Sequence, residues 1–184
     1  MRLKWPVVIL LLVLMGSCRE EVLPKPKAML RLEYPNSSGG ILQTDYFEFE
    51  LNALTKVKEQ DHRSLTLEYP KMKGSIFITY KKVEGNLEKL LSDAQKLSYE
   101  HAVKADAIDP KEFINQQDKV YGMFYEVRGD AASQAQFYVT DSLDHFVTGS
   151  LYFYAKPNYD SIYPAAVYLQ NDIQRIMETL KWKN

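Results

Sequence analysis

The sequence predicts an α+β fold in which a largely antiparallel sheet is flanked by helices. Short segments that alternate apolar and polar residues, typical of strands with one solvated face, occupy the chain from residue 30 to residue 83. A helical repeat of apolar residues follows at 87–102. Three further strand-like segments and a second helical repeat complete the chain, an order that favours a sheet with helices returning onto it.

Four strands are expected before the first helix. They are the segments 30–34, 47–51, 65–69 and 75–83. Residues 71–74 (KMKG) indicate a turn, so the last two of these strands are predicted to form a hairpin. Residues 36–40 (NSSGG) are expected to form a turn or a flexible loop, and the stretch 36–63 carries no recognisable motif.

The first helix is predicted to begin after Asn86, an N-cap residue that follows Gly85. It is amphipathic and should pack on the sheet by one face. His101 falls on its apolar stripe, where a hydrogen-bonded residue at the edge of the core is expected. Residues 103–119 are mixed in character: Asp109-Pro110 indicates a break, and the apolar pair at 113–114 should dock the segment on the domain.

The second half predicts an antiparallel meander and a closing helix. Strands are expected at 120–128, which is apolar on both faces and therefore central, at 135–140 and at 145–155. Ser161 can cap the final helix, with Trp182 as an apolar anchor behind it. Its predicted buried stripe comprises Ala165, Leu169, Ile173, Ile176, Met177 and Leu180. This order of elements resembles the Mog1p/PsbP-like α/β/α sandwich.

The N-terminus indicates export and lipid attachment. Residues 1–17 combine Arg2 and Lys4 with a short apolar run and two small residues, as in a signal peptide. Cys18 follows directly, which resembles the lipobox of bacterial lipoproteins, although Met15 stands where that motif usually has Leu. Residues 18–28 are then the lipidated cysteine and a stiff Pro/Lys tether, and residues 29–184 form one globular domain. A plain secretory signal with an incidental cysteine is the alternative.

Composition excludes several classes of function. Without Arg2 and Lys4 the remaining chain has a net charge of −3 and no basic block, so no nucleic-acid partner is expected. Cys18 is the single cysteine, which rules out an intrachain disulfide. The three histidines lack the spacing of a helix-borne metal pair, and neither a metal nor another cofactor is predicted.

The segment 140–145 brings Ser142, an aspartate and His145 together in sequence. A catalytic triad is defined by geometry in space, and serine and aspartate between two strands are ordinary turn residues, so no catalytic residue is assigned. The chain is rich in tyrosine, with 13 residues. Those on predicted strands are Tyr121, Tyr125, Tyr138, Tyr152 and Tyr154, which indicate either packing on the sheet or an aromatic docking face for a protein.

An ordered set of segments resembles the gliding-motility lipoprotein GldD family of Bacteroidetes. The segments are 24–27 (PKPK), 69–71 (YPK), 104–108 (KADAI), 120–122 (VYG), 136–142 (QFYVTDS), 149–153 (GSLYF), 157–161 (PNYDS) and 178–182 (ETLKW). They cover nearly the whole chain after the signal, although Leu143 stands where a threonine is expected.

The resemblance implies a non-enzymatic component or assembly factor of the gliding motility and type IX secretion machinery. It also implies protein partners in that apparatus and a lipid anchor on Cys18 as the one site residue. The protein should lie in the cell envelope, on the periplasmic face of the inner or outer membrane or at the cell surface. A periplasmic lipoprotein that binds a small ligand or a glycan on the tyrosine-lined sheet is the alternative.

Overall fold

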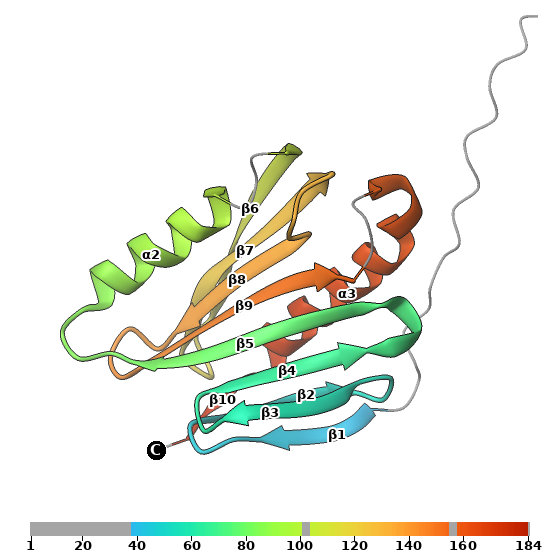
Figure 1. Cartoon of the computed structure of the whole chain (residues 1–184). Helices are drawn as coiled ribbons and strands as arrows, with labels where there is room; N and C mark the ends of the chain where they lie inside the picture. The colour runs from blue at the N-terminus through green and yellow to red at the C-terminus, as the bar shows by residue number, and fades with distance from the viewer. Residues whose placement is uncertain (1–37, 101–103, 155–157, 184) are drawn as a thin grey trace, which may run out of the picture.

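The fold is α+β, as predicted, and the residues that the structure describes form two antiparallel sheets and two helices (Figure 1). The computed structural model describes residues 38–100, 104–154 and 158–183. The elements are β1 (Ser38–Gln43), β2 (Phe47–Asn52), β3 (Lys56–Asp61), β4 (Ser64–Tyr69), a 3₁₀ turn (Pro70–Met72), β5 (Gly74–Lys82), α2 (Leu87–Glu100), β6 (Ala105–Asn115), β7 (Val120–Gly129), β8 (Ala135–Thr140), β9 (His145–Phe153), α3 (Tyr159–Thr179) and β10 (Lys181–Trp182).

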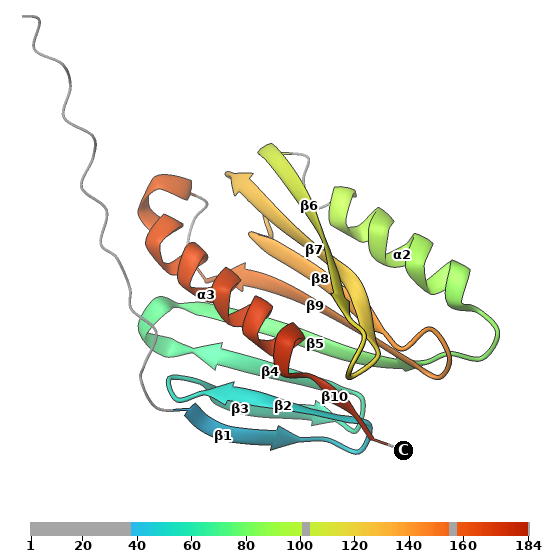
Figure 2. The same ribbon diagram turned by 180° about the vertical axis from the view of Figure 1, so that it is seen from behind.

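The seven-stranded sheet has the order β3-β4-β5-β9-β8-β7-β6, and the three-stranded sheet has the order β1-β2-β10. Because β5 is followed in sequence by β6 at the far edge, α2 must carry the chain across the strands between them, and it lies over one face of the large sheet (Figure 1). Helix α3 covers the opposite face and leads into β10 beside β2 (Figure 2).

The main core lies on the α3 side of the large sheet. Alternate residues of β4, β5, β8 and β9 point into it, as expected for strands with a period of two. They meet Leu169, Ile173 and Ile176 of α3, which are fully buried. Phe47 and Phe49 of β2 belong to the same cluster, so the small sheet packs on this core as well. A smaller core under α2 contains Leu90, Ala94 and Phe146.

A buried polar cluster ties β2 and β4 to α3. The side-chain amide of Asn52 donates to Asp172 Oδ1 at 3.2 Å and to the Tyr168 hydroxyl at 3.1 Å. The Tyr69 hydroxyl donates to the other carboxylate oxygen of Asp172. Burial raises the pKa of Asp172 to about 7, although the nearby Arg175 acts in the opposite direction. Burial raises the pKa of Tyr69 in the same way.

Several predicted elements are confirmed. Strands β2, β4 and β5 and helix α2 lie within a few residues of their predicted positions, and β4 and β5 pair as a hairpin. Strands β7, β8 and β9 form the predicted antiparallel meander, with β7 in the interior of the sheet. Trp182 does close the domain, but it does so within a strand, β10. The likeness to the Mog1p/PsbP-like sandwich stays a prediction.

The predicted break at Asp109-Pro110 is wrong, because residues 105–115 form one strand, β6. Among the described strands, β6 pairs with β7 alone, at the edge of the sheet. A proline is tolerated in an edge strand because its missing N–H can face away from the partner strand. Strand β3 was not predicted, because its sequence KVKEQD lacks an apolar pattern.

Two smaller predictions are also wrong. Residues 38–40 belong to β1 and not to a loop, and a bulge lies between Ser38 and Ile41. A Cβ on Gly39 would lie 2.8 Å from the backbone of Asn52, so glycine permits this close approach of β1 to the end of β2. The N-cap of α3 is Asn158, whose side chain accepts from the backbone N–H of Ser161. The predicted strand at 30–34, the signal peptide, the tether and Cys18 lie outside the described residues.

Candidate functional site around the C-terminal strand

The Ser142–His145 turn is fixed by its own aspartate. Asp141 Oδ1 accepts backbone N–H groups of Leu143, Asp144 and His145 at 2.8–3.0 Å. Burial would raise the pKa of Asp141, but these hydrogen bonds, led by that of His145, outweigh it and hold the pKa below its usual value. Ser142 takes a left-handed conformation at φ 67° and is exposed. The carboxylate is thus engaged by the turn backbone, as the sequence predicted for turn residues.

His62 does not join this turn. His62 is exposed, with Nδ1 3.7 Å from an oxygen of Asp45. His101 lies outside the described residues. Among the residues that the structure describes, no group of three or more histidine, cysteine, aspartate or glutamate side chains is placed to hold a metal ion.

The predicted tyrosines separate into packed and exposed residues. Tyr125 is buried beneath α2, with its ring 6.1 Å from that of Tyr99 and 6.5 Å from that of Tyr138. Burial raises the pKa of Tyr125 to about 12. Tyr121 and Tyr152 are half-buried on the same face of the sheet, and Tyr154 is exposed. Packing on the sheet therefore accounts for Tyr125 and Tyr138, and these two do not form an open docking face.

The C-terminal strand brings distant segments together. Trp182 stacks on His145, with ring centroids 5.1 Å apart and planes within 8° of parallel. The indole Nε1–H donates to the carbonyl of Lys119 at 3.0 Å. His145 Nδ1 in turn lies 3.0 Å from the Tyr80 hydroxyl. Trp182 therefore joins the β6–β7 turn and the β8–β9 turn to the three-stranded sheet.

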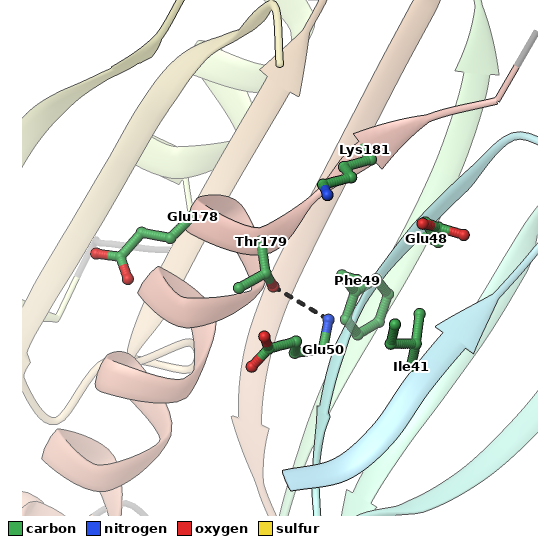
Figure 3. Close-up of a pocket in the computed structure, with 7 residues that line it drawn as sticks. All are labelled: Ile41, Glu48, Phe49, Glu50, Glu178, Thr179 and Lys181. Carbon is green, nitrogen blue, oxygen red and sulfur yellow. Dashed lines mark hydrogen bonds between the residues drawn. The ribbon is translucent and has the colours of Figure 1, made fainter. Parts of the chain in front are cut away.

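A hollow of about 230 Å³ lies on one side of β10, between α3 and the three-stranded sheet (Figure 3). We call it the helix hollow, and its lining residues are Ile41, Glu48, Phe49, Glu50, Glu178, Thr179 and Lys181. Because β10 is only two residues long, it pairs with Phe47 and Glu48 and leaves the N–H of Glu50 without a strand partner. The Thr179 hydroxyl accepts that N–H at 3.1 Å (Figure 3). The carboxylate of Glu50 pairs with Arg175.

A second hollow of about 440 Å³ lies on the other side of β10. We call it the turn hollow, and its lining residues are Gln117, Asp118, Lys119, Asp141, Leu143, Asp144, His145, Lys181 and Trp182. Lys181 borders both hollows, so β10 forms the ridge between them. An indole, carboxylates and lysines around an open hollow can bind a ligand through stacking and charge without any chemical step.

The sequence indicated only part of this site. The sequence brings Ser142 and His145 together in one turn segment, and the structure adds Trp182, which stacks on His145. From the sequence alone, Trp182 is expected only to anchor the domain by packing. A prediction of strand pairing could not reveal the contact between His145 and Trp182, because β9 and β10 belong to different sheets. The one sequence signal is a tryptophan placed just after a long amphipathic helix, where the chain is about to end.

The chain matches the model of a known protein family. The family model described as gliding motility lipoprotein GldD matches residues 19–182. None of the curated proteins compared with the chain matches it. In the described part of the chain, no helix has both the length and the apolar character needed to cross a membrane.

Proposed function

Because the chain belongs to the family of gliding motility lipoproteins GldD, we propose that it is a non-enzymatic component or assembly factor of the gliding motility apparatus and of the type IX secretion machinery linked to it. The observation that carries the proposal is the family match, which spans the entire described domain apart from its last residue. Membership of a lipoprotein family supports a membrane anchor, a place in the cell envelope and protein partners.

Cys18 is the proposed point of attachment. Its thiol would carry diacylglycerol after removal of residues 1–17, with a further acyl chain such as palmitate on the new N-terminus. One acyl chain gives only reversible binding, whereas two or more hold a protein on a membrane stably. The domain would then lie on the periplasmic face of the inner or outer membrane, or at the cell surface.

Binding of a small ligand or a glycan is the second candidate. The observation that favours it is the turn hollow, where the Trp182 indole lies among carboxylates and an amide. The C–H face of a sugar packs on an aromatic ring, and its hydroxyls donate to carboxylates. The site then differs from the tyrosine-lined sheet that the sequence suggested, because Tyr125 and Tyr138 lie under α2.

Deletion of the gene and complementation test the main proposal. The deletion strain should lose spreading on agar and secretion of type IX cargo, and the wild-type gene should restore both. Cys18→Ser should release the protein from the membrane fraction and fail to complement. A deletion strain that spreads and secretes normally contradicts the proposed role. Continued membrane association of C18S without lipid label contradicts the anchor.

A further inference from the structure

We propose that the two hollows on either side of β10 dock a basic segment of a protein partner, one that presents lysine or arginine side chains next to an apolar residue. This inference rests on the proposed function, since it names the chemistry of the partner that a non-enzymatic component binds. The helix hollow and the turn hollow are adjacent and share Lys181, so one extended segment could contact both.

The charge of the lining residues selects a cationic partner. Six carboxylates line the two hollows, from Glu48, Glu50, Glu178, Asp118, Asp141 and Asp144. The two lining cations are Lys119 and Lys181, so the surface is acidic by four charges. Glu50 is paired with Arg175, and Asp141 is engaged by its turn. One carboxylate oxygen of Asp118 accepts from Asn115 Nδ2 at 3.0 Å. Glu48, Glu178, Asp144 and the other oxygen of Asp118 remain to face a ligand. The negative potential of these carboxylates would attract a cationic segment and orient it.

The apolar residues at the hollows can contact the apolar residue of the proposed basic segment. Leu143 is 69 % exposed at the edge of the turn hollow, and Ile41 is 62 % exposed at the edge of the helix hollow. Trp182 lines the turn hollow beside Asp118 and Asp144. Tryptophan is the best aromatic partner for a lysine or arginine cation, and carboxylates beside it add charge-assisted hydrogen bonds.

The hollows are also rigid, which lowers the entropic cost of binding. The β8–β9 turn is held by three N–H bonds to Asp141, and the β6–β7 turn is held by the indole of Trp182. Lys119 and Ser142, at φ 54° and 67°, take left-handed conformations that cost free energy in residues other than glycine. Their surroundings hold these turns in place around the turn hollow.

Tryptophan fluorescence gives a direct readout. The chain has two tryptophans, Trp5 and Trp182, and Trp5 belongs to the proposed signal peptide. Trp5→Phe in the full chain leaves Trp182 as the single reporter in the processed and the unprocessed protein alike. This variant, purified in detergent, is titrated at low salt with the synthetic peptide Lys-Arg-Leu-Lys-Arg. We expect a saturable change in Trp182 emission that disappears at about 0.5 M salt, where the Debye length falls to roughly 4 Å.

Paired charge variants locate the binding site. In the Trp5→Phe background, Asp118→Asn with Asp144→Asn should weaken peptide binding about tenfold. The control pair, Glu88→Gln with Asp93→Asn, removes the same charge from the exposed face of α2 and should change affinity less than about twofold. If the two double variants bind the peptide with equal affinity, the inference is wrong. So does a Trp182 response to a neutral chitin oligosaccharide without one to the peptide, since that outcome favours the glycan candidate.

Complementation separates this inference from the proposed function. If the deletion strain stops spreading and the D118N/D144N variant fails to restore it while E88Q/D93N succeeds, both stand. If D118N/D144N restores spreading fully and binds the peptide normally, the docking inference fails and the proposed function stands. If the deletion strain spreads normally while peptide binding requires Asp118 and Asp144, the proposed function fails and the basic-segment site stands.

Discussion

The side-chain amide of Asn52 on β2 donates to the carboxylate of Asp172 on α3 at 3.2 Å, although Asp172 is only 1 % exposed. A carboxylate in such a place is costly to ionise, since the side chains that donate hydrogen bonds to it, Asn52 and Tyr69, are neutral. The cluster joins the small sheet to α3, so the charge of one buried residue affects how firmly the two are held together.

The first prediction concerns the pH dependence of folding stability. The pKa of Asp172 in the folded state, about 7, lies above the ordinary aspartate value of 3.8, so its proton stabilises the folded state. Its contribution is fully present below about pH 4 and is lost as the pH rises through 7. The loss is about 4 kcal/mol at roughly 1.4 kcal/mol per pH unit. Urea unfolding of wild type at pH values from 4 to 8 measures it.

Asp172→Asn isolates this contribution. An amide resembles the protonated carboxyl, because its oxygen can still accept from Asn52 while its NH₂ donates toward Tyr69. We therefore expect the difference in unfolding free energy between D172N and wild type to shift in favour of D172N as the pH rises from 4 to 8. Asp93→Asn on the surface serves as the control and should follow wild type. Parallel curves for D172N and wild type would refute the buried-proton account.

The second prediction concerns Trp182. Its removal by Trp182→Ala deletes the stack on His145 and the hydrogen bond to Lys119, and should destabilise the domain by about 2–3 kcal/mol because the side chain is half-buried. Trp182→Phe retains a stacking ring and should cost about 1 kcal/mol for the lost hydrogen bond. Urea midpoints give both values. Tyr154→Ala, at an exposed aromatic residue, should stay within about 0.5 kcal/mol of wild type. An equally small effect of Trp182→Ala would contradict the role of Trp182 in joining the two turns to the small sheet.

The third prediction concerns the backbone of β2. Thr179 accepts the N–H of Glu50 and donates to the carbonyl of Arg175 at 2.8 Å. Thr179→Val keeps the shape of the side chain and removes the hydroxyl, which should cost about 1–2 kcal/mol. Hydrogen exchange at the Glu50 amide should accelerate, whereas Thr179→Ser should preserve its protection. Unchanged exchange at Glu50 in T179V would show that the threonine does not replace the missing strand partner.

The fourth prediction concerns Gly149 on β9. A Cβ at this position would collide with the ring of Phe137 on β8, its register partner. Gly149→Ala should therefore destabilise the domain by about 1–3 kcal/mol through overpacking. A second substitution, Phe137→Leu, removes the ring and should recover part of that loss in a double-mutant cycle. Additive effects of the two substitutions would mean that the ring does not cover the glycine.

The elements predicted most reliably from the sequence are those whose repeat of apolar residues shows which face is buried. Helix α2 and strands β7 to β9 carry apolar residues at the period of their secondary structure. The apolar residues on one or both faces of each element are therefore enough to predict it. Strands β3 and β6 lie at the two edges of the large sheet, where half of each strand is solvated and charges are tolerated. Their sequences show no strong alternation of apolar and polar residues. They are strands because they pair with β4 and β7, and that pairing cannot be read from their own sequences.

The candidate site was predictable only in fragments. Asp141 and its neighbours are turn residues by composition, and the sequence identified them as such. The hollows, however, form because β10, at residues 181–182, pairs with β2, at residues 47–48, and these two segments are far apart in the sequence. No local pattern around Trp182 or Lys119 encodes that meeting, which depends on the length and direction of α3.

The return of the last strand also has a kinetic consequence. Lys183 binds the carbonyl of Thr44 at 2.9 Å across 139 residues of sequence, so β2 gains its second neighbour only once the final residues are available. Contacts of such high sequence separation form late and slow the folding of a domain. During synthesis from the N-terminus, residues 181–183 must therefore emerge before this sheet can close. Until then β2 exposes one edge, and premature termination near the end would leave a pairing-competent strand that invites aggregation.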